Sequence, residues 1–108
     1  MVRQISSREL FRHMENGHAV TLLDVRRAEE HAFAALPGSV LIPLNELAAR
    51  LDEVPQPDDG ILVVYCHHGV RSLSGAALLE RHGRANVFSL AGGIDAWALE
   101  VNPDMPRY

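Results

Sequence analysis

The segment from Cys66 to Ser72 contains the residue types most able to carry out chemistry. It holds the only cysteine of the chain, two histidines, a glycine and an arginine, in the order Cys66-His67-His68-Gly69-Val70-Arg71-Ser72. The apolar, β-branched run 61–65 before it predicts a strand buried on both faces, and the pattern after it predicts a helix. Open α/β folds bind their ligands where such a strand ends.

The expected chemistry of this segment is that of a thiolate. Backbone N–H groups at the start of a helix, the helix dipole and Arg71 all favour an anion, and Gly69 tolerates the positive φ of a tight loop. Cys66 is therefore expected to react as a thiolate, which is the nucleophilic form. It could take a sulfur atom from a donor and hold it as a persulfide until cyanide or a thiol removes it. Without a second cysteine in the chain, that sulfur would leave to another molecule.

Two other interpretations of these residues, a structural cysteine and a metal site, compete with a reactive thiolate. A lone cysteine is commonly a small buried hydrophobe, but the strand end, glycine, histidines and arginine favour a reactive residue. Cys66, His67 and His68 also suggest a metal site. No further Cys, His or carboxylate lies at ligand spacing, so neither a metal nor a cofactor is expected. The two histidines are instead expected to supply hydrogen-bond donors and positive charge at the rim of the pocket.

Two other functions use similar residues. Cysteine phosphatases and arsenate reductases also place a thiolate and an arginine around an anion, but with one more residue between them than the four that separate Cys66 from Arg71. The loop also lacks an acid that could protonate a leaving alcohol. A non-catalytic interaction module is the second alternative, against which the presence of Cys66, Gly69 and Arg71 argues.

Size and composition predict one folded domain over residues 1–108. The chain is 47% hydrophobic and 22% charged, and its formal charge of -4 comes with dispersed basic residues, which counts against a nucleic-acid partner. Its longest apolar runs are far shorter than the roughly 20 residues of a spanning helix, so no membrane partner is expected. No secretory signal is visible at the start, which favours a cytoplasmic location.

Alternating patterns predict an open α/β sheet. Strands are expected over 20–25, 40–42, 61–65 and 86–90, with 61–65 as the central strand. Helices are expected after a capping box formed by Ser6 and Glu9, over 44–51, over 71–82, and from the Gly92-Gly93 pair through Trp97. A turn is expected at Pro37-Gly38 and a polar loop over 55–60.

Three apolar stripes are expected to face the core from these helices. Their members are Leu10, Phe11 and Met14 in the first, Leu44, Leu47, Ala48 and Leu51 in the second, and Leu73, Ala76, Ala77 and Leu79 in the third. Gly17 and Gly83 are expected to end the first and third helices.

The sequence resembles the rhodanese family almost from end to end. The similar segments are Asp24-Val25-Arg26 with Glu30, Pro37-Gly38-Ser39, the loop from Cys66 to Ser72, and Ala91-Gly92-Gly93 with Trp97. The chain departs from many relatives at Ala35, where they have a histidine. The resemblance implies an open five-stranded parallel sheet flanked by helices on both faces. It also implies Cys66 as the persulfide carrier and His67, His68, Gly69, Val70 and Arg71 as the sulfur-binding cradle.

The function implied by the resemblance is a sulfurtransferase. Sulfane sulfur would pass from thiosulfate or a persulfide donor to cyanide, a thiol or a protein sulfur acceptor, with polysulfide as a further candidate donor. Residues 102–108 resemble the tail of rhodanese modules appended to enzymes that activate sulfur-carrier proteins, which hints at a biosynthetic sulfur relay. Asp24, Arg26 and Glu30 are expected to tie loops together through an Arg-Glu pair, and Trp97 to lie in the core.

Overall fold

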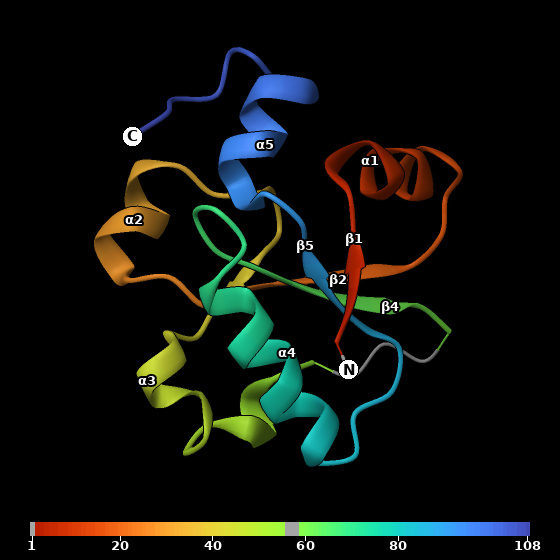
Figure 1. The fold of residues 1–108 in the computed structure, drawn as a ribbon, viewed down its shortest axis with the longest axis vertical. Coiled ribbons are helices and arrows are strands. Elements are labelled where there is room, and N and C mark those ends of the chain that lie inside the picture. The colour runs from red at the N-terminus through yellow and green to blue at the C-terminus, as the bar shows by residue number, and fades with distance from the viewer. Residues whose placement is uncertain (1, 56–58) are drawn as a thin grey trace.

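A five-stranded, all-parallel sheet forms the centre of the fold (Figure 1). The structure is a computed structural model and describes residues 2–55 and 59–108. The strands are β1 (Arg3–Ile5), β2 (Val20–Asp24), β3 (Val40–Leu41), β4 (Ile61–Tyr65) and β5 (Val87–Leu90), in the spatial order β1-β5-β4-β2-β3. The expected central strand is confirmed as β4, which pairs with β2 and β5.

Helices cover both faces of the sheet. They are α1 (Ser7–Glu15), α2 (Ala28–Phe33), α3 (Leu44–Leu47), α4 (Arg71–Arg81) and α5 (Gly93–Glu100), with a 3-10 turn at Leu51–Glu53. Side chains of β4 alternate between the two cores, as a strand period of two requires. Leu62 and Val64 pack with α3 and α4, whereas Val63 and Tyr65 pack with α1 and α5. The α/β class and the two-sided covering are thus as expected.

Local signals located most of these elements. The capping box at α1 is confirmed, because the Ser6 N–H donates to the Glu9 carboxylate at 2.9 Å and the Glu9 N–H donates to Ser6 Oγ at 3.1 Å. The Pro37-Gly38 turn is also present, with Gly38 at φ 76°. Part of the expected loop over 55–60 lies outside the described residues, at 56–58.

The apolar stripes were predicted less well. The helix expected over 44–51 is split into the short α3 and the 3-10 turn, and Ala48 is exposed. Phe11 and Met14 on α1 are also exposed, at 41% and 37%, although Phe11 packs edge-on against Trp97.

The face of α4 is shifted as well. Leu73 and Ala77 are half-buried, and Ser72 and Gly75 are buried instead. A side chain added at Gly75 would approach the methyl groups of Val64 and Val25 at 3.2 and 3.4 Å, so the helix lies close against the sheet.

Two elements carried too little local signal to be identified. In β1 only Ile5 is buried, and in α2 no residue is buried. A strand of three residues and an exposed helix of six show almost no hydrophobic period. None of the helices in the described ranges is long and apolar enough to span a bilayer.

Candidate active site

Cys66 lies directly after β4, at the carboxyl end of the central strand, and is 1% exposed. Its Sγ accepts hydrogen bonds from the backbone N–H of Gly69 at 3.1 Å and of Ser72 at 3.4 Å. Gly69 adopts a φ of 97°, which turns its N–H back toward the sulfur and is rarely open to other residue types. These amides provide the converging donors expected at the start of α4.

The loop from 66 to 71, here called the sulfur loop, rests on the beginning of α5. The N–H groups of Ile94 and Asp95 donate to the carbonyls of Cys66 and His67 at 2.9 and 3.1 Å. Gly93, at φ 62°, lies so close that a Cβ there would clash with both carbonyls. The Gly92-Gly93 pair therefore does more than start a helix, because it provides the seat for the sulfur loop.

Two buried serines complete the surroundings of the sulfur. The Oγ atoms of Ser72 and Ser89 are 2.7 Å apart, and the Cys66 Sγ lies 3.5 Å from Ser72 Oγ. Both serines are fully buried. Sequence reasoning placed Ser72 in the loop but gave it no role, and it overlooked Ser89, whose position on β5 gives no local signal of this contact.

Arg71 is held at the rim of the site by Glu30 of α2. Two hydrogen bonds, of 2.8 and 3.1 Å, join its guanidinium to that carboxylate. They lower the pKa of Glu30 to about 2, against the opposing effect of its burial. Arg71 also lines a cavity of about 310 Å³ together with Arg27, Pro43 and Asn45, among others. Its charge thus lies at the end of the sulfur loop and is already partly neutralised.

The expected Arg-Glu pair therefore involves Arg71 and not Arg26. Arg26 is fully buried and pairs with Asp24 at the end of β2, through bonds of 2.8 and 2.7 Å. It also donates to the carbonyl of Ala34 at 2.6 Å. This pair ties β2 to the chain that follows α2, which is a structural role.

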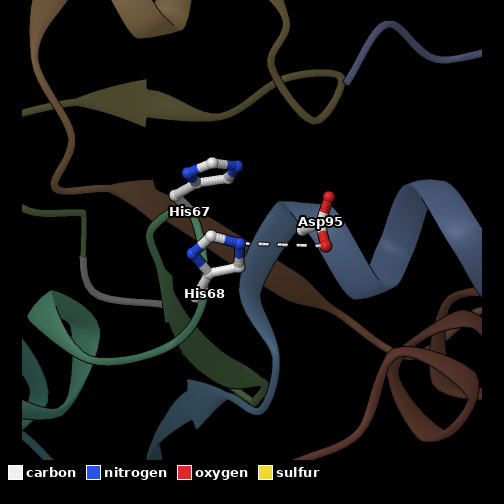
Figure 2. A group of neighbouring side chains, drawn as sticks. All are labelled: His67, His68 and Asp95. Atoms are coloured by element: carbon white, nitrogen blue, oxygen red, sulfur yellow. Dashed lines mark ion pairs between the residues drawn. The ribbon is translucent and has the colours of Figure 1, made fainter. Parts of the chain in front are cut away.

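His67 and His68 lie next to each other, but only His68 is joined to Asp95 in Figure 2. Their rings stack with centroids 3.9 Å apart, and His68 Nε2 lies 3.8 Å from the Asp95 carboxylate. Burial, followed by the neighbouring charge of His68, lowers the pKa of His67. Because the lower pKa disfavours the charged form, His67 is a poorer source of positive charge than we expected.

Asp95 of α5 is a carboxylate close to both histidines, although no carboxylate was expected at metal-ligand spacing from them. Ligand atoms of His67, His68 and Asp95 all lie within 4.8 Å of one another. A metal ion lies in the plane of each imidazole that binds it, and two stacked rings only 28° apart do not aim their nitrogens at one point. Asp95 also pairs with Arg107 at 2.9 Å, which lowers its pKa. Stacking and ion pairing account for this cluster.

The expected cradle residues thus occupy different positions. Gly69 donates to the sulfur, while His67, His68 and Arg71 interact with residues around the rim. Val70 is 73% exposed on the outside of the loop. The arrangement can stabilise a single anionic sulfur atom through short-range backbone donors, with a guanidinium at its edge.

Comparison with known proteins identifies the family of this chain. The family described as "Rhodanese-like domain" matches residues 6–100. A protein named "Sulfurtransferase" from Allochromatium vinosum is 35% identical over 91% of this chain and 90% of its own length. The probable adenylyltransferase/sulfurtransferase MoeZ of Mycobacterium tuberculosis is also 35% identical, but this chain spans only 26% of it.

Solved structures lead to the same family. A rhodanese-related protein from Thermoplasma volcanium superposes with a TM-score of 0.81 and 32% identity, over 94% of this chain and 95% of that one. The human single-domain sulfurtransferase TSTD1 gives a TM-score of 0.77 and 29% identity, over 93% and 98% of the two chains. In sequence and in fold, this chain belongs to the rhodanese-like family, whose members similar to it include single-domain sulfurtransferases.

Proposed function

We propose that this protein is a sulfurtransferase that carries sulfane sulfur as a persulfide on Cys66. The proposal rests on the hydrogen bonds of the Cys66 sulfur, which accepts from the backbone N–H groups of Gly69 and Ser72 next to the start of α4. Fixed donors around one buried sulfur favour a negative charge on it without rearrangement. Relatives named as sulfurtransferases support the same activity.

In the loading step the Cys66 thiolate attacks the outer sulfur of the donor. With thiosulfate, the new S–S bond forms as the bond to the sulfonate sulfur breaks, and sulfite leaves with that electron pair. In the second step cyanide attacks the terminal sulfur of the persulfide and leaves as thiocyanate, which restores the thiolate. A thiolate acceptor reacts in the same way and leaves as its own persulfide. No metal or redox cofactor enters either step.

The proposed partners are small anions and thiols, and the residues around the sulfur support that choice. Gly69 and Ser72 donate hydrogen bonds to the sulfur, and Arg71 is a cation at the rim that can draw an anionic donor toward it. Phosphate-ester hydrolysis is less well supported. The short loop leaves few amides to surround a tetrahedral anion, and Glu30, the nearest acid at Arg71, is held as a carboxylate by its low pKa.

The test is the intact mass of the purified protein after thiosulfate and then after cyanide. We expect the mass to rise by one sulfur atom and to return to its first value, because Cys66 is the only thiol available. The Cys66→Ser variant should gain nothing in the same treatment.

A serine variant that turned cyanide over as fast as the wild type would disprove the mechanism. Rapid hydrolysis of an aryl phosphate by the wild type, without sulfur loading, would favour a phosphatase instead. If the wild type neither loads sulfur nor hydrolyses an aryl phosphate, a binding module without catalysis would be favoured.

A further inference from the structure

The chain after α5 returns to the site and places Tyr108 against the sulfur loop. Figure 1 shows this segment, residues 101–108, turning back from the end of α5 toward α2. The Tyr108 ring stacks on His67 with centroids 3.9 Å apart and planes 9° apart. The ring also meets Phe33, at the end of α2, edge-on with centroids 5.7 Å apart. Tyr108 thus spans the space between α2 and the sulfur loop.

The hydroxyl of Tyr108 joins two ion pairs. It accepts a hydrogen bond from Arg26 at 2.8 Å and donates one to Glu30 at 2.7 Å. Arg26 is held by the buried Asp24, and Glu30 holds Arg71. Burial raises the pKa of Tyr108 to about 12, so the hydroxyl keeps its proton across the usual working range. A continuous series of hydrogen bonds therefore runs from the end of β2 to the start of α4.

His67 depends on this contact for its position. Its Nε2 is buried and has no hydrogen-bond partner among the described residues. The ring stacks on His68 and on Tyr108, and it also forms a hydrogen bond with the backbone of Tyr108. Stacking of this kind contributes about 0.5–1.5 kcal/mol beyond buried area in aromatic pairs. Loss of Tyr108 would free one face of a residue that directly follows Cys66.

We propose that Tyr108 is a positioning residue for the sulfur loop, holding it closed through His67 and holding Arg71 in place through Glu30. The inference rests on the proposed sulfur transfer at Cys66 for its catalytic consequence, but not for its structural one. Because Cys66 is 1% exposed, a reagent reaches its thiol only when the loop opens locally. Tyr108 is therefore expected to set both the frequency of that opening and the placement of Arg71.

The experiment uses two variants and one control. Tyr108→Phe removes the hydroxyl and keeps the stacked ring, while Tyr108→Ala removes both. Leu99→Ala is the control, because it also removes an exposed apolar side chain, 58% exposed, from α5, the helix that precedes this segment. Each protein is alkylated with excess iodoacetamide, followed by intact mass, and assayed for sulfur transfer from thiosulfate to cyanide.

We expect Tyr108→Ala to be alkylated about fivefold faster than wild type or faster, because the stacking contact on His67 no longer opposes opening. Tyr108→Phe should keep an alkylation rate within about twofold of wild type, and its KM for thiosulfate should rise about threefold with kcat little changed. That split follows because the hydroxyl acts on Glu30 and Arg71, whereas the ring acts on His67. Leu99→Ala should match wild type in both assays.

Alkylation of Tyr108→Ala at the wild-type rate, with an unchanged KM in Tyr108→Phe, would overturn the proposal. If Tyr108→Ala does not fold, a wild-type KM in Tyr108→Phe is by itself sufficient to reject the role assigned to the hydroxyl. A wild type that is alkylated but never loads sulfur would disprove the proposed function. In that case the alkylation rates of the variants still decide whether Tyr108 holds the loop.

Discussion

At the level of single residues, the site is defined by hydrogen-bond donors around one buried sulfur atom. Gly69 and Ser72 supply backbone N–H groups, and these donors are fixed by the loop and by the first turn of α4. The Ser72 hydroxyl contacts both the Cys66 sulfur, at 3.5 Å, and the buried Ser89 hydroxyl, at 2.7 Å. A buried hydroxyl that loses its partner keeps the full cost of its desolvation.

This pair gives a prediction about stability. Ser72→Ala and Ser89→Ala should each lower the free energy of unfolding by about 1–3 kcal/mol, because each leaves the other hydroxyl without this bond. The double variant should lose clearly less than the sum of the two. Urea denaturation of the four proteins measures this coupling, and strictly additive losses would show that the two hydroxyls do not depend on each other.

At the level of elements, the sulfur loop is held between two helix starts. The first turn of α4 binds the sulfur, and the first turn of α5 binds the carbonyls of Cys66 and His67. The two helices begin beside neighbouring strands, β4 and β5, so the parallel sheet brings their first turns together. This close approach explains why the sequence has a glycine at 93.

Gly93→Ala should therefore damage the site more than a comparable change elsewhere. Gly38→Ala is the matched control, because Gly38 also has a positive φ, of 76°, but a Cβ there would meet no atom within 4 Å. The Gly38→Ala control should lower the free energy of unfolding by about 1–2 kcal/mol, from backbone strain alone. Gly93→Ala should cost at least about 2 kcal/mol more, because the Cβ must displace the loop carbonyls.

Urea denaturation measures both costs, and the mass gained from thiosulfate measures loading of the same proteins. We expect loading to be slowed by Gly93→Ala and retained by Gly38→Ala. Equal costs for the two substitutions would contradict the idea that the turn before α5 supports the sulfur loop.

At the level of the whole molecule, one network of charges joins segments that are distant in sequence. Asp24 ends β2 and Arg26 follows it, Glu30 lies on α2, Arg71 starts α4, and Tyr108 lies beyond α5. The side chain of Glu30 is only 14% exposed, so its interaction with Arg71 is screened less than a surface pair. The network should therefore make stability depend on pH.

The pKa of Glu30 is about 2 in the folded protein, below its ordinary value of 4.5. The folded state thus binds this proton less tightly than the unfolded state does. The stabilisation from Glu30 is fully present above about pH 4.5 and is lost as the pH falls toward 2. The difference in unfolding free energy between wild type and Glu30→Gln should accordingly shrink between pH 6 and pH 3.

The control for this prediction is Glu29→Gln. Glu29 lies on the same helix but forms an exposed pair with Arg27, with side chains 66% and 78% exposed. The effect of Glu29→Gln on the free energy of unfolding should be small and change little with pH, because exposed ion pairs contribute little to stability. Urea denaturation at several pH values measures both differences. A difference for Glu30→Gln that stays constant down to pH 3 would contradict the role of the Arg71 pair.

The sequence by itself determined the parts of the fold that local patterns specify. The apolar run 61–65, the capping box at Ser6, and the glycine of the sulfur loop each depend on neighbours a few residues away. These signals located β4, α1, and the loop that carries Cys66. The resemblance to a known family supplied the number of strands, and the structure confirmed it.

Only the tertiary structure decided which residues meet at the site. Parallel strands all end at the same edge of the sheet, so this edge collects side chains from loops that are far apart in the chain. That is how Glu30 reaches Arg71, Ser89 reaches Ser72, and Tyr108 reaches His67. Contacts of this kind leave no periodic pattern in the sequence, because they follow from the crossing of the chain over the sheet and not from the spacing of neighbouring residues.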